Sequence, residues 1–173
     1  MAGLQLLKDI ISEQEEIDLL SHIQQGEWLD IYTRRVQHFG YLYEYRTRGL
    51  KRMYEDNDET KGIPSWLSPS CVLKEMQPDQ IIINEYKDGQ GISEHSDAFC
   101  FGPKIISLSL GAPTVMTFTG GISSIDITLP RRSLLILEGP ARYKLKHAIK
   151  KHTGDNRISI TYRTLATGVT TSK

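Results

Sequence analysis

After Pro78, the chain consists of short, mostly apolar segments, nearly all of them bounded by Gly or Pro. This pattern predicts strands joined by turns. The predicted strands span residues 80–86, 92–97, 104–110, 114–118, 124–129, 133–138, 143–149 and 157–164. Such close spacing favours a sandwich or a jelly roll, because a parallel sheet would need longer helical connections.

The first 77 residues follow a different pattern. The sequence Ser-Glu-Gln-Glu that starts at Ser12 is a capping box, so we expect a helix from there to about Gly26. Its buried face would be formed by Ile17, Leu20 and Ile23. This helix would support the sheet without taking part in chemistry.

The rest of this N-terminal part is predicted to be mixed. Residues 28–32 and 36–45 are aromatic and β-branched and predict strands. Residues 46–61 are charged and predict an exposed loop that serves as a lid or connector. Residues 64–67 and 70–75 predict short helices, and we expect the helices together to cover one face of the sheet.

These patterns predict one mainly β (α+β) domain, a sandwich or a jelly roll, with N-terminal covering helices. Within this single domain, 1–173, we place helices and substrate-lid strands in residues 1–77, the jelly-roll core in 78–165 and a tail in 166–173. A chain of 173 residues can bury most of the apolar surface of two packed layers.

The overall composition does not indicate a binding partner. Hydrophobic residues make up 39% of the chain and charged residues 24%, as in soluble globular proteins, and 21 basic residues balance 21 acidic ones. Cys71 and Cys100 are isolated and suit a reducing compartment. The N-terminus carries no signal-like apolar run, and no window approaches a membrane span, so we expect a cytoplasmic or nuclear protein.

The distribution of charge is more informative. Residues 34–52 carry six Lys or Arg against one acidic residue, and residues 131–151 carry seven against one. Aromatic residues accompany both stretches: Phe39, Tyr41, Tyr43, Tyr45 and Tyr143. Basic stretches are common as solvated faces, but the aromatic residues among them favour a nucleic-acid surface on which rings stack bases.

A candidate metal site begins within residues 84–97. His95 and Asp97 are two residues apart, so in an extended segment both side chains lie on one face. His147 follows fifty residues later on another predicted strand, where a single histidine would more often be structural. Two histidines and a carboxylate together indicate an Fe(II) site with open positions, and a zinc hydrolase remains the alternative on ligand types alone.

The last predicted strand alternates with a period of two, which places Arg157, Ser159, Thr161 and Arg163 on one face. Buried guanidinium groups need anionic partners, and a small dicarboxylate could pair with both arginines. The two residues lie about 20 Å apart on a straight strand. The alternative is therefore that Arg163 pairs with a protein carboxylate and only Arg157 meets the ligand.

The joint pattern resembles the AlkB family of Fe(II)- and 2-oxoglutarate-dependent dioxygenases over residues 78–164. The resemblance implies a jelly roll of the double-stranded β-helix type and three iron ligands, His95, Asp97 and His147. It implies that the cosubstrate is held by Asn84, Tyr86, Arg157, Ser159 and Arg163. Arg157 would take the distal carboxylate of 2-oxoglutarate and Arg163 the end nearer the metal. The expected reaction is hydroxylation by O₂ with release of succinate and CO₂.

Three further segments resemble one branch of that family, the AlkB-like domain of the tRNA wobble-uridine hydroxylase. They are the motif Arg35-x-x-His38-Phe39-Gly40-Tyr41, residues 104–111 and residues 129–135. In that enzyme the domain accompanies an RNA-recognition motif and a methyltransferase domain, for which this chain has no room. We therefore expect a monomer that finds RNA, preferably tRNA, or DNA with its own surface or through a separate RNA-binding or methyltransferase partner.

Phe99 departs from the family's repair enzymes, which usually carry an acidic residue two positions after the metal-binding Asp. An aromatic ring can stack a base, but it does not offset the charge of a base such as 1-methyladenine. We therefore expect hydroxylation of a modified or alkylated base, preferably in RNA. Other candidate substrate contacts are His38, Phe39, Tyr41, Tyr43, Arg131, Arg132, Arg142 and Lys144.

Two other functions stay open from the sequence. An oxidative demethylase of the same chemistry would repair alkylated DNA or RNA bases and release formaldehyde. A protein-directed or non-catalytic member of the family would act on a side chain or use the iron site to regulate binding. The complete set of ligands argues against inactivity.

Overall fold

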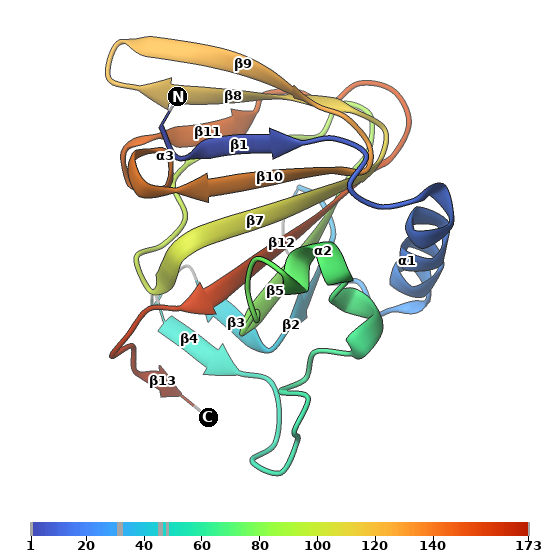
Figure 1. The fold of residues 1–173 in the computed structure, drawn as a ribbon, viewed down its shortest axis with the longest axis vertical. Helices are drawn as coiled ribbons and strands as arrows, with labels where there is room; N and C mark the ends of the chain where they lie inside the picture. The colour runs from blue at the N-terminus through green and yellow to red at the C-terminus, as the bar shows by residue number, and fades with distance from the viewer. Residues whose placement is uncertain (1, 31–32, 45–46, 48, 173) are drawn as a thin grey trace.

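The computed structural model describes residues 2–30, 33–44, 47 and 49–172. Two β-sheets lie against each other, and helices cover the outer face of the larger sheet (Figure 1). The mainly β jelly roll with covering helices that the sequence predicts is confirmed.

The larger sheet has the strand order β1-β10-β7-β12-β5-β2, and all neighbours in it are antiparallel. Its strands are β1 (Leu4–Leu7), β2 (Val36–Phe39), β5 (Gln80–Tyr86), β7 (Phe101–Gly111), β10 (Ser133–Glu138) and β12 (Arg157–Leu165). Strand β12 lies between β5 and β7 and pairs with both along most of its length. The strand that carries the two arginines is therefore central in the sheet.

The smaller sheet has the order β6-β11-β8-β9, and a third short sheet has the order β13-β4-β3. The smaller sheet consists of β6 (Ile92–His95), β8 (Thr114–Gly120), β9 (Ser123–Leu129) and β11 (Lys146–Ile149). The third consists of β3 (Tyr41–Glu44), β4 (Gly49–Arg52) and β13 (Thr171–Ser172). Gly40 separates β2 from β3 with a φ of 77°, a conformation that favours glycine.

The predicted alternation of β12 is confirmed. Ile158, Ile160 and Tyr162 are buried in a core between the larger sheet and the helices. Between the two sheets lies a second core, which includes Phe118 and Leu135. The polar side chains of β12 point to this second side, where they must find partners inside the protein.

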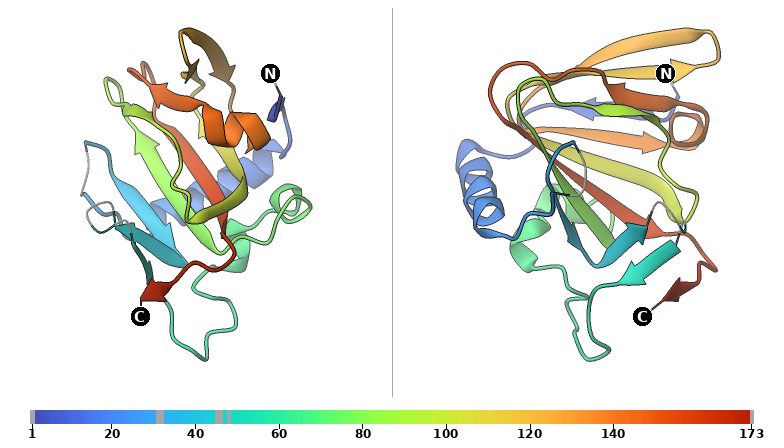
Figure 2. Two further views of the ribbon diagram at one scale, coloured as in Figure 1. Left: turned by 90° about the vertical axis from the view of Figure 1, so that its left-hand side faces the viewer. Right: turned by 180° about the vertical axis from the view of Figure 1, so that it is seen from behind.

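The helices lie mostly on the outer face of the larger sheet (Figure 2). They are α1 (Glu13–Gln25), the 3₁₀ helix η1 (Ser65–Leu67) and α2 (Ser70–Leu73), whereas α3 (Gly139–Lys144) joins β10 to β11. The capping box is confirmed, because the Ser12 hydroxyl accepts from the Glu15 N–H and the Glu15 carboxylate accepts from the Ser12 N–H. The helix ends at Gly26 as predicted.

The predicted buried face of α1 is partly wrong. Ile17 is 57% exposed, and the residues of α1 that the structure buries are Glu16, Leu19 and Ile23. Leu20 is only partly buried against the core. The reason is that a carboxylate in the first turn is held by the sheet, which turns Ile17 outward.

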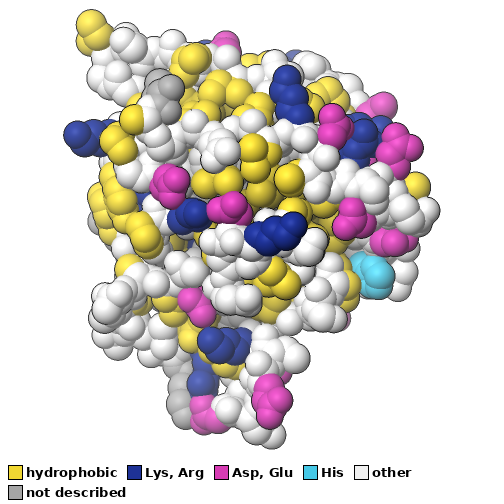
Figure 3. Space-filling model, viewed as in Figure 1, with side chains coloured by type: hydrophobic (Ala, Val, Ile, Leu, Met, Phe, Trp, Pro, Cys, Tyr) yellow, Lys and Arg dark blue, Asp and Glu magenta, His cyan; other side chains and the backbone are white. Residues whose placement is uncertain are grey.

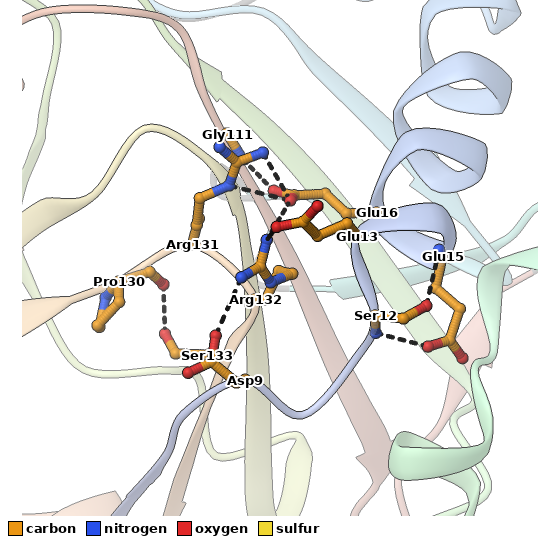
Figure 4. A network of polar contacts seen from close by, with 10 residues as sticks. All are labelled: Asp9, Ser12, Glu13, Glu15, Glu16, Gly111, Pro130, Arg131, Arg132 and Ser133. Atoms are coloured by element: carbon orange, nitrogen blue, oxygen red, sulfur yellow. Dashed lines mark hydrogen bonds and ion pairs between the residues drawn. The ribbon is translucent and has the colours of Figure 1, made fainter.

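That carboxylate belongs to Glu16, and Figure 4 shows its network. One oxygen accepts the backbone N–H of Gly111 at 2.8 Å, and the other accepts from Arg131 at 2.8 and 3.0 Å. Arg132 donates to Asp9 at 3.2 Å and to Glu13 at 3.3 Å. The network fixes the start of α1 to the turn between β9 and β10.

Several predicted boundaries are corrected. Strand β1 was not expected, and it extends the larger sheet from the N-terminal part. Strand β4 forms within the predicted loop 46–61, where residues 46 and 48 lie outside the described part. Residues 143 and 144 belong to α3 instead of a strand, because Pro140 favours a helix start.

The predicted strand 28–32 is also corrected. In its described part, Leu29 makes an isolated bridge to Val36, and residues 31 and 32 lie outside the description, as does Tyr45 of the basic stretch. Among the described residues, none of the helices has the length and apolar character needed to cross a membrane.

Candidate active site

The two sheets bring the predicted iron ligands together between them. Strands β6 and β11 pair so that His95 and His147 are direct neighbours, with ring centroids 4.4 Å apart. Asp97 follows directly after β6, and its carboxylate oxygen lies 3.8 Å from Nε2 of His147. Imidazole nitrogens and a carboxylate are ligand types that Fe(II) accepts, so these three side chains would fit such an ion.

The carboxylate of Asp97 is turned towards Arg163. Arg163 donates through Nη2 to Asp97 and through Nη1 to the side-chain oxygen of Gln80, at 3.0 Å in the latter case. Within the described residues, no three His, Cys, Asp or Glu side chains are already arranged as a closed ligand set. The arrangement matches the alternative in which Arg163 pairs with a protein carboxylate.

Protonation favours metal binding at neutral pH. Burial lowers the pKa of His147 to about 4, despite the nearby Asp97, so the ring is neutral and can donate a lone pair. Burial alone would raise the pKa of Asp97, but Arg163 and the two histidines hold it at about 2. Nδ1 of His95 contacts the carbonyl of Ser93 at 2.8 Å, which leaves its Nε2 to face the site.

Arg157 is completely buried, and burial lowers the pKa of its guanidinium to about 10. Nη2 donates to the hydroxyl of Ser109 at 3.0 Å, and the guanidinium carbon lies 5.3 Å from the centre of the Tyr86 ring. Nε and Nη1 have no hydrogen-bond partner among the described residues. A buried cation with two unpaired N–H groups fits a carboxylate ligand, because such groups are costly to leave unpaired.

The other predicted cosubstrate residues line a small cavity together with the ligand cluster, and Arg157 lies behind the Tyr86 ring, outside the lining of that cavity. This cavity is bordered by Asn84, Tyr86, Ser159, Thr161 and Arg163 together with His95, Asp97 and His147. The side-chain oxygen of Asn84 accepts from Nε of Arg34 at 2.9 Å, and Ser159 shares a hydrogen bond of 2.9 Å with Ser107. The structure therefore gathers the predicted set, apart from Arg157, around one cavity.

A larger cavity of about 540 Å³ opens from the same cluster towards the surface. It shares His95, Asp97 and Arg163 with the small one. The candidate substrate residues His38, Tyr43 and Phe99 also line it. Phe99 is 77% exposed and stacks on Tyr143 with the ring planes 7° apart, so an aromatic pair stands at the opening.

The remaining candidate substrate residues lie elsewhere. Phe39 packs edge to face on Trp66 in the core under the helices, and the Tyr41 hydroxyl bonds to that of Tyr54. Arg131 and Arg132 belong to the Glu16 network. Phe39 faces the opposite side from His38 because side chains alternate along β2.

Arg142 is buried as well, and its role is local. It donates to the backbone carbonyls of Asp97 and Ala98 at 2.9 and 2.7 Å, so it holds the loop that follows the metal motif. Burial lowers the pKa of its guanidinium. Lys144, its neighbour on α3, is exposed.

Several side chains of the two basic stretches form ion pairs. Arg35 pairs with Glu85, Arg52 with Asp56, and Lys146 with Glu94. On the face seen in Figure 3, basic side chains lie among acidic ones. Part of the basic charge that the sequence pattern assigned to a nucleic-acid surface is therefore used in ion pairs within the protein.

A cleft of about 1050 Å³ lies away from the ligand cluster. It runs over the outer face of the smaller sheet, where Thr117 and Thr119 lie, and along the loop of residues 89–94. None of the predicted iron or cosubstrate residues lines it. The predicted iron ligands thus line the two smaller cavities between the sheets.

Sequence comparison identifies the class. The profile of the 2OG-Fe(II) oxygenase superfamily matches residues 3–163, and the chain belongs to this superfamily. Accordingly, it is an Fe(II)- and 2-oxoglutarate-dependent dioxygenase that uses O₂, and it is of the AlkB type.

Individual relatives are consistent with this. The tRNA (carboxymethyluridine(34)-5-O)-methyltransferase ALKBH8 of Mus musculus is 36% identical over 167 residues, which cover 85% of this chain and 24% of that protein. The uncharacterized protein L905 of Acanthamoeba polyphaga mimivirus is 34% identical, with 93% of this chain and 84% of that protein covered. The chain thus spans about a quarter of the mouse relative.

A solved structure shows the same fold. OsALKBH1 superimposes with a TM-score of 0.78 at 16% sequence identity, and the superposition covers 94% of this chain and 96% of that one. At this identity the likeness concerns the fold alone.

Sequence reasoning missed some residues of the site. Gln80 lies on the same face of β5 as Asn84 and Tyr86, so the period of two could have revealed it. Arg34 precedes β2 and carries no local signal for its bond to Asn84. Tyr143 was expected in a strand, and its stacking on Phe99 depends on the distance between α3 and the loop after β6.

Proposed function

We propose that this dioxygenase hydroxylates an uncharged, modified or alkylated base in nucleic acid, preferably in RNA or tRNA. His95, Asp97 and His147 would hold the iron, and Arg157 would hold the distal carboxylate of 2-oxoglutarate. Asn84, Tyr86 and Ser159 would border the cosubstrate. The observation that carries the proposal is Arg157, which is fully buried against Tyr86 at the border of the small cavity and whose Nε and Nη1 have no partner among the described residues.

Bound iron, 2-oxoglutarate and O₂ would convert a substrate C–H group to C–OH with release of succinate and CO₂. The residues of the chain serve this reaction in distinct ways. Arg163 would keep Asp97 ionised and oriented, with Gln80 fixing the arginine from its other side. The walls of both sheets would exclude water from the small cavity.

The nature of the opening supports a flat, uncharged substrate. The stacked pair of Phe99 and Tyr143 offers an aromatic face at the mouth of the larger cavity. Among the residues that line this cavity within the described chain, the acidic one is Asp97, which Arg163 already neutralises. A cationic base would thus find no free carboxylate there, which favours a neutral base over the cationic bases of the repair enzymes.

A direct test follows succinate and nucleoside mass in parallel. The purified chain is incubated with Fe(II), 2-oxoglutarate and ascorbate, together with bulk tRNA or a panel of methylated RNA and DNA oligonucleotides. We expect a nucleoside 16 mass units heavier, with one succinate for each product. Formaldehyde release from methylated oligonucleotides would instead establish the demethylase, and oxidation of neither polymer would refute the proposal.

A further inference from the structure

Two buried polar side chains in the larger cavity lack partners. His38 is 8% exposed, and within the described residues neither of its ring nitrogens has a hydrogen-bond partner. Gln80 is completely buried, and its side-chain nitrogen likewise lacks a partner there. Both side chains line the cavity that opens from His95 and Asp97. Buried polar groups are nearly always paired, so two such groups facing one space indicate a polar ligand.

The orientation of each group follows from its neighbours. The side-chain oxygen of Gln80 accepts from Arg163 at 3.0 Å, so its NH₂ group is the end that is free to donate. His38 lies on β2 opposite Ile82, and its side chain shares the inner face of the sheet with Gln80. Burial and the nearby Arg163 lower the pKa of His38 to about 4, so at neutral pH its ring offers one donor and one acceptor.

We propose that His38 and Gln80 form a specificity pair that reads the polar edge of the target base and prefers a ring with an exocyclic carbonyl beside a ring N–H, as in uracil. The inference rests on the proposed function and narrows its substrate class. The Gln80 NH₂ group would donate to the carbonyl oxygen. The neutral ring of His38 would bond to the adjoining N–H or to the second carbonyl.

The chemistry of the base distinguishes this pair from simple stacking. Uracil presents an acceptor, a donor and an acceptor along this edge, whereas cytosine presents an amino donor in place of one carbonyl. An amino group would meet the NH₂ group of Gln80 donor to donor. The wrong base would therefore leave buried groups unpaired, which sites of this type reject more strongly than a change of shape.

The test uses two RNA hairpins that differ only at one loop base, 5-methyluridine or 5-methylcytidine. Both bases are neutral and of the same size, and both carry an oxidisable methyl group on the same carbon. We compare kcat/KM for the two hairpins, and their Kd by fluorescence anisotropy under nitrogen. The variants are His38→Phe and Gln80→Met, with His22→Phe and Gln25→Met on the exposed face of α1 as matched controls.

We expect the wild type to prefer 5-methyluridine, and each cavity variant to reduce the ratio of kcat/KM by about tenfold, as for the loss of one buried hydrogen bond. The Kd ratio should fall in the same direction, and the controls should keep both ratios. The ratio is the informative quantity, because a change transmitted through Arg163 to the metal would affect both hairpins equally.

Two results would overturn the inference in different ways. If the wild type oxidises the hairpins without preferring 5-methyluridine, or if the variants keep its ratio, the specificity pair is refuted and the proposed function stands. If the wild type neither binds nor oxidises any nucleic acid, the proposed function fails and the inference with it. Circular dichroism and thermal unfolding would show whether each variant is folded, and His38→Gln replaces His38→Phe if that variant is not.

Discussion

Two clusters of charged and polar side chains, one around the buried Glu16 and one between the two sheets, differ in how completely their hydrogen bonds are satisfied. In the Glu16 network, both carboxylate oxygens are occupied by the backbone of Gly111 and by Arg131. In the site between the sheets, Arg157 and His38 keep unpaired nitrogens. A closed cluster stabilises a fold, whereas an open one costs stability and is retained where a ligand completes it.

The difference also appears in where the charges lie. Arg131 is 55% exposed in its side chain, so water shares its charge with Glu16, whereas Arg157 is fully buried. Substitutions in the Glu16 network should therefore lower stability and keep activity. Substitution of Arg157 should lower activity and keep stability. The following predictions test this contrast.

The largest effect is expected for His147→Ala, which removes one proposed iron ligand. Loss of a ligand should lower turnover by more than about 100-fold, the upper end of what outer-shell changes alone produce. Succinate formation and iron content after gel filtration measure the effect. His22→Ala on the surface of α1 serves as the control, and undiminished turnover in His147→Ala would refute the metal assignment.

Glu16→Gln should affect stability and leave the chemistry intact. Removing the charge weakens the pairing with Arg131 and the bond to the Gly111 N–H, which we expect to cost about 1–2 kcal/mol of unfolding free energy, because solvent screens the half-exposed Arg131. Urea denaturation measures this value. Glu13→Gln is the matched change at an exposed position of the same network and should cost less than about 1 kcal/mol.

Arg157→Met should show the reverse behaviour. We expect the Kd for 2-oxoglutarate to rise about 100-fold, because charge-assisted bonds to the distal carboxylate are lost. Stability should stay level or rise, since an incompletely paired buried cation is replaced by an apolar side chain. Calorimetric titration of 2-oxoglutarate under nitrogen and urea denaturation give both values.

The matched variant is Arg131→Met, in which the same chemical change is made in the closed cluster. It should lower stability and keep the affinity for 2-oxoglutarate. If Arg157→Met behaved in the same way as Arg131→Met, the open site would be no more than a second structural network.

The smallest expected effect is a change in how folding stability depends on pH. The folded state depresses the pKa of His38 to about 4 from 6.5, so the unfolded chain binds the proton more readily in that range. Stability from this group is therefore complete above pH 6.5 and is lost as the pH falls towards 4. Between pH 6.5 and pH 4 the wild type should lose on the order of 2 kcal/mol of unfolding free energy through this group. His38→Phe should not show this loss.

Urea denaturation of the metal-free chain at several pH values measures this difference. The wild type should lose more stability than His38→Phe on acidification, so the difference between the two curves should change steadily from pH 6.5 to pH 4. Parallel curves for the two proteins would show that His38 is already solvated in the folded state.

The sequence allowed much of the site to be predicted. Period-two alternation places Arg157, Ser159, Thr161 and Arg163 on one face of β12, and the structure has them there. The sequence also predicts His95 and Asp97 on one strand, whereas β6 ends at His95 and Asp97 follows it, with both side chains bordering the small cavity. Local geometry decides these arrangements, because neighbouring residues of a strand have fixed directions.

Predictions that depended on partners distant in the chain succeeded less often. Arg131 and Arg132 look like a basic nucleic-acid surface in the sequence, yet they bind residues of α1 more than 110 positions away. Arg142 looks exposed by composition and is instead buried under the loop after Asp97. Charge patterns carry no information about which opposite charge lies next to them in space.

The sequence by itself determined the series of short strands, the His-x-Asp motif and the alternating arginine strand, because each follows from short-range patterns. Only the tertiary structure decided which groups are paired and which are left open. It closed the hydrogen bonds of Glu16 and left those of Arg157, His38 and Gln80 unfilled, since pairing depends on how the two sheets and α1 pack. Paired groups such as Glu16 stabilise the fold of this dioxygenase, and the unpaired groups are the ones we propose to bind ligands.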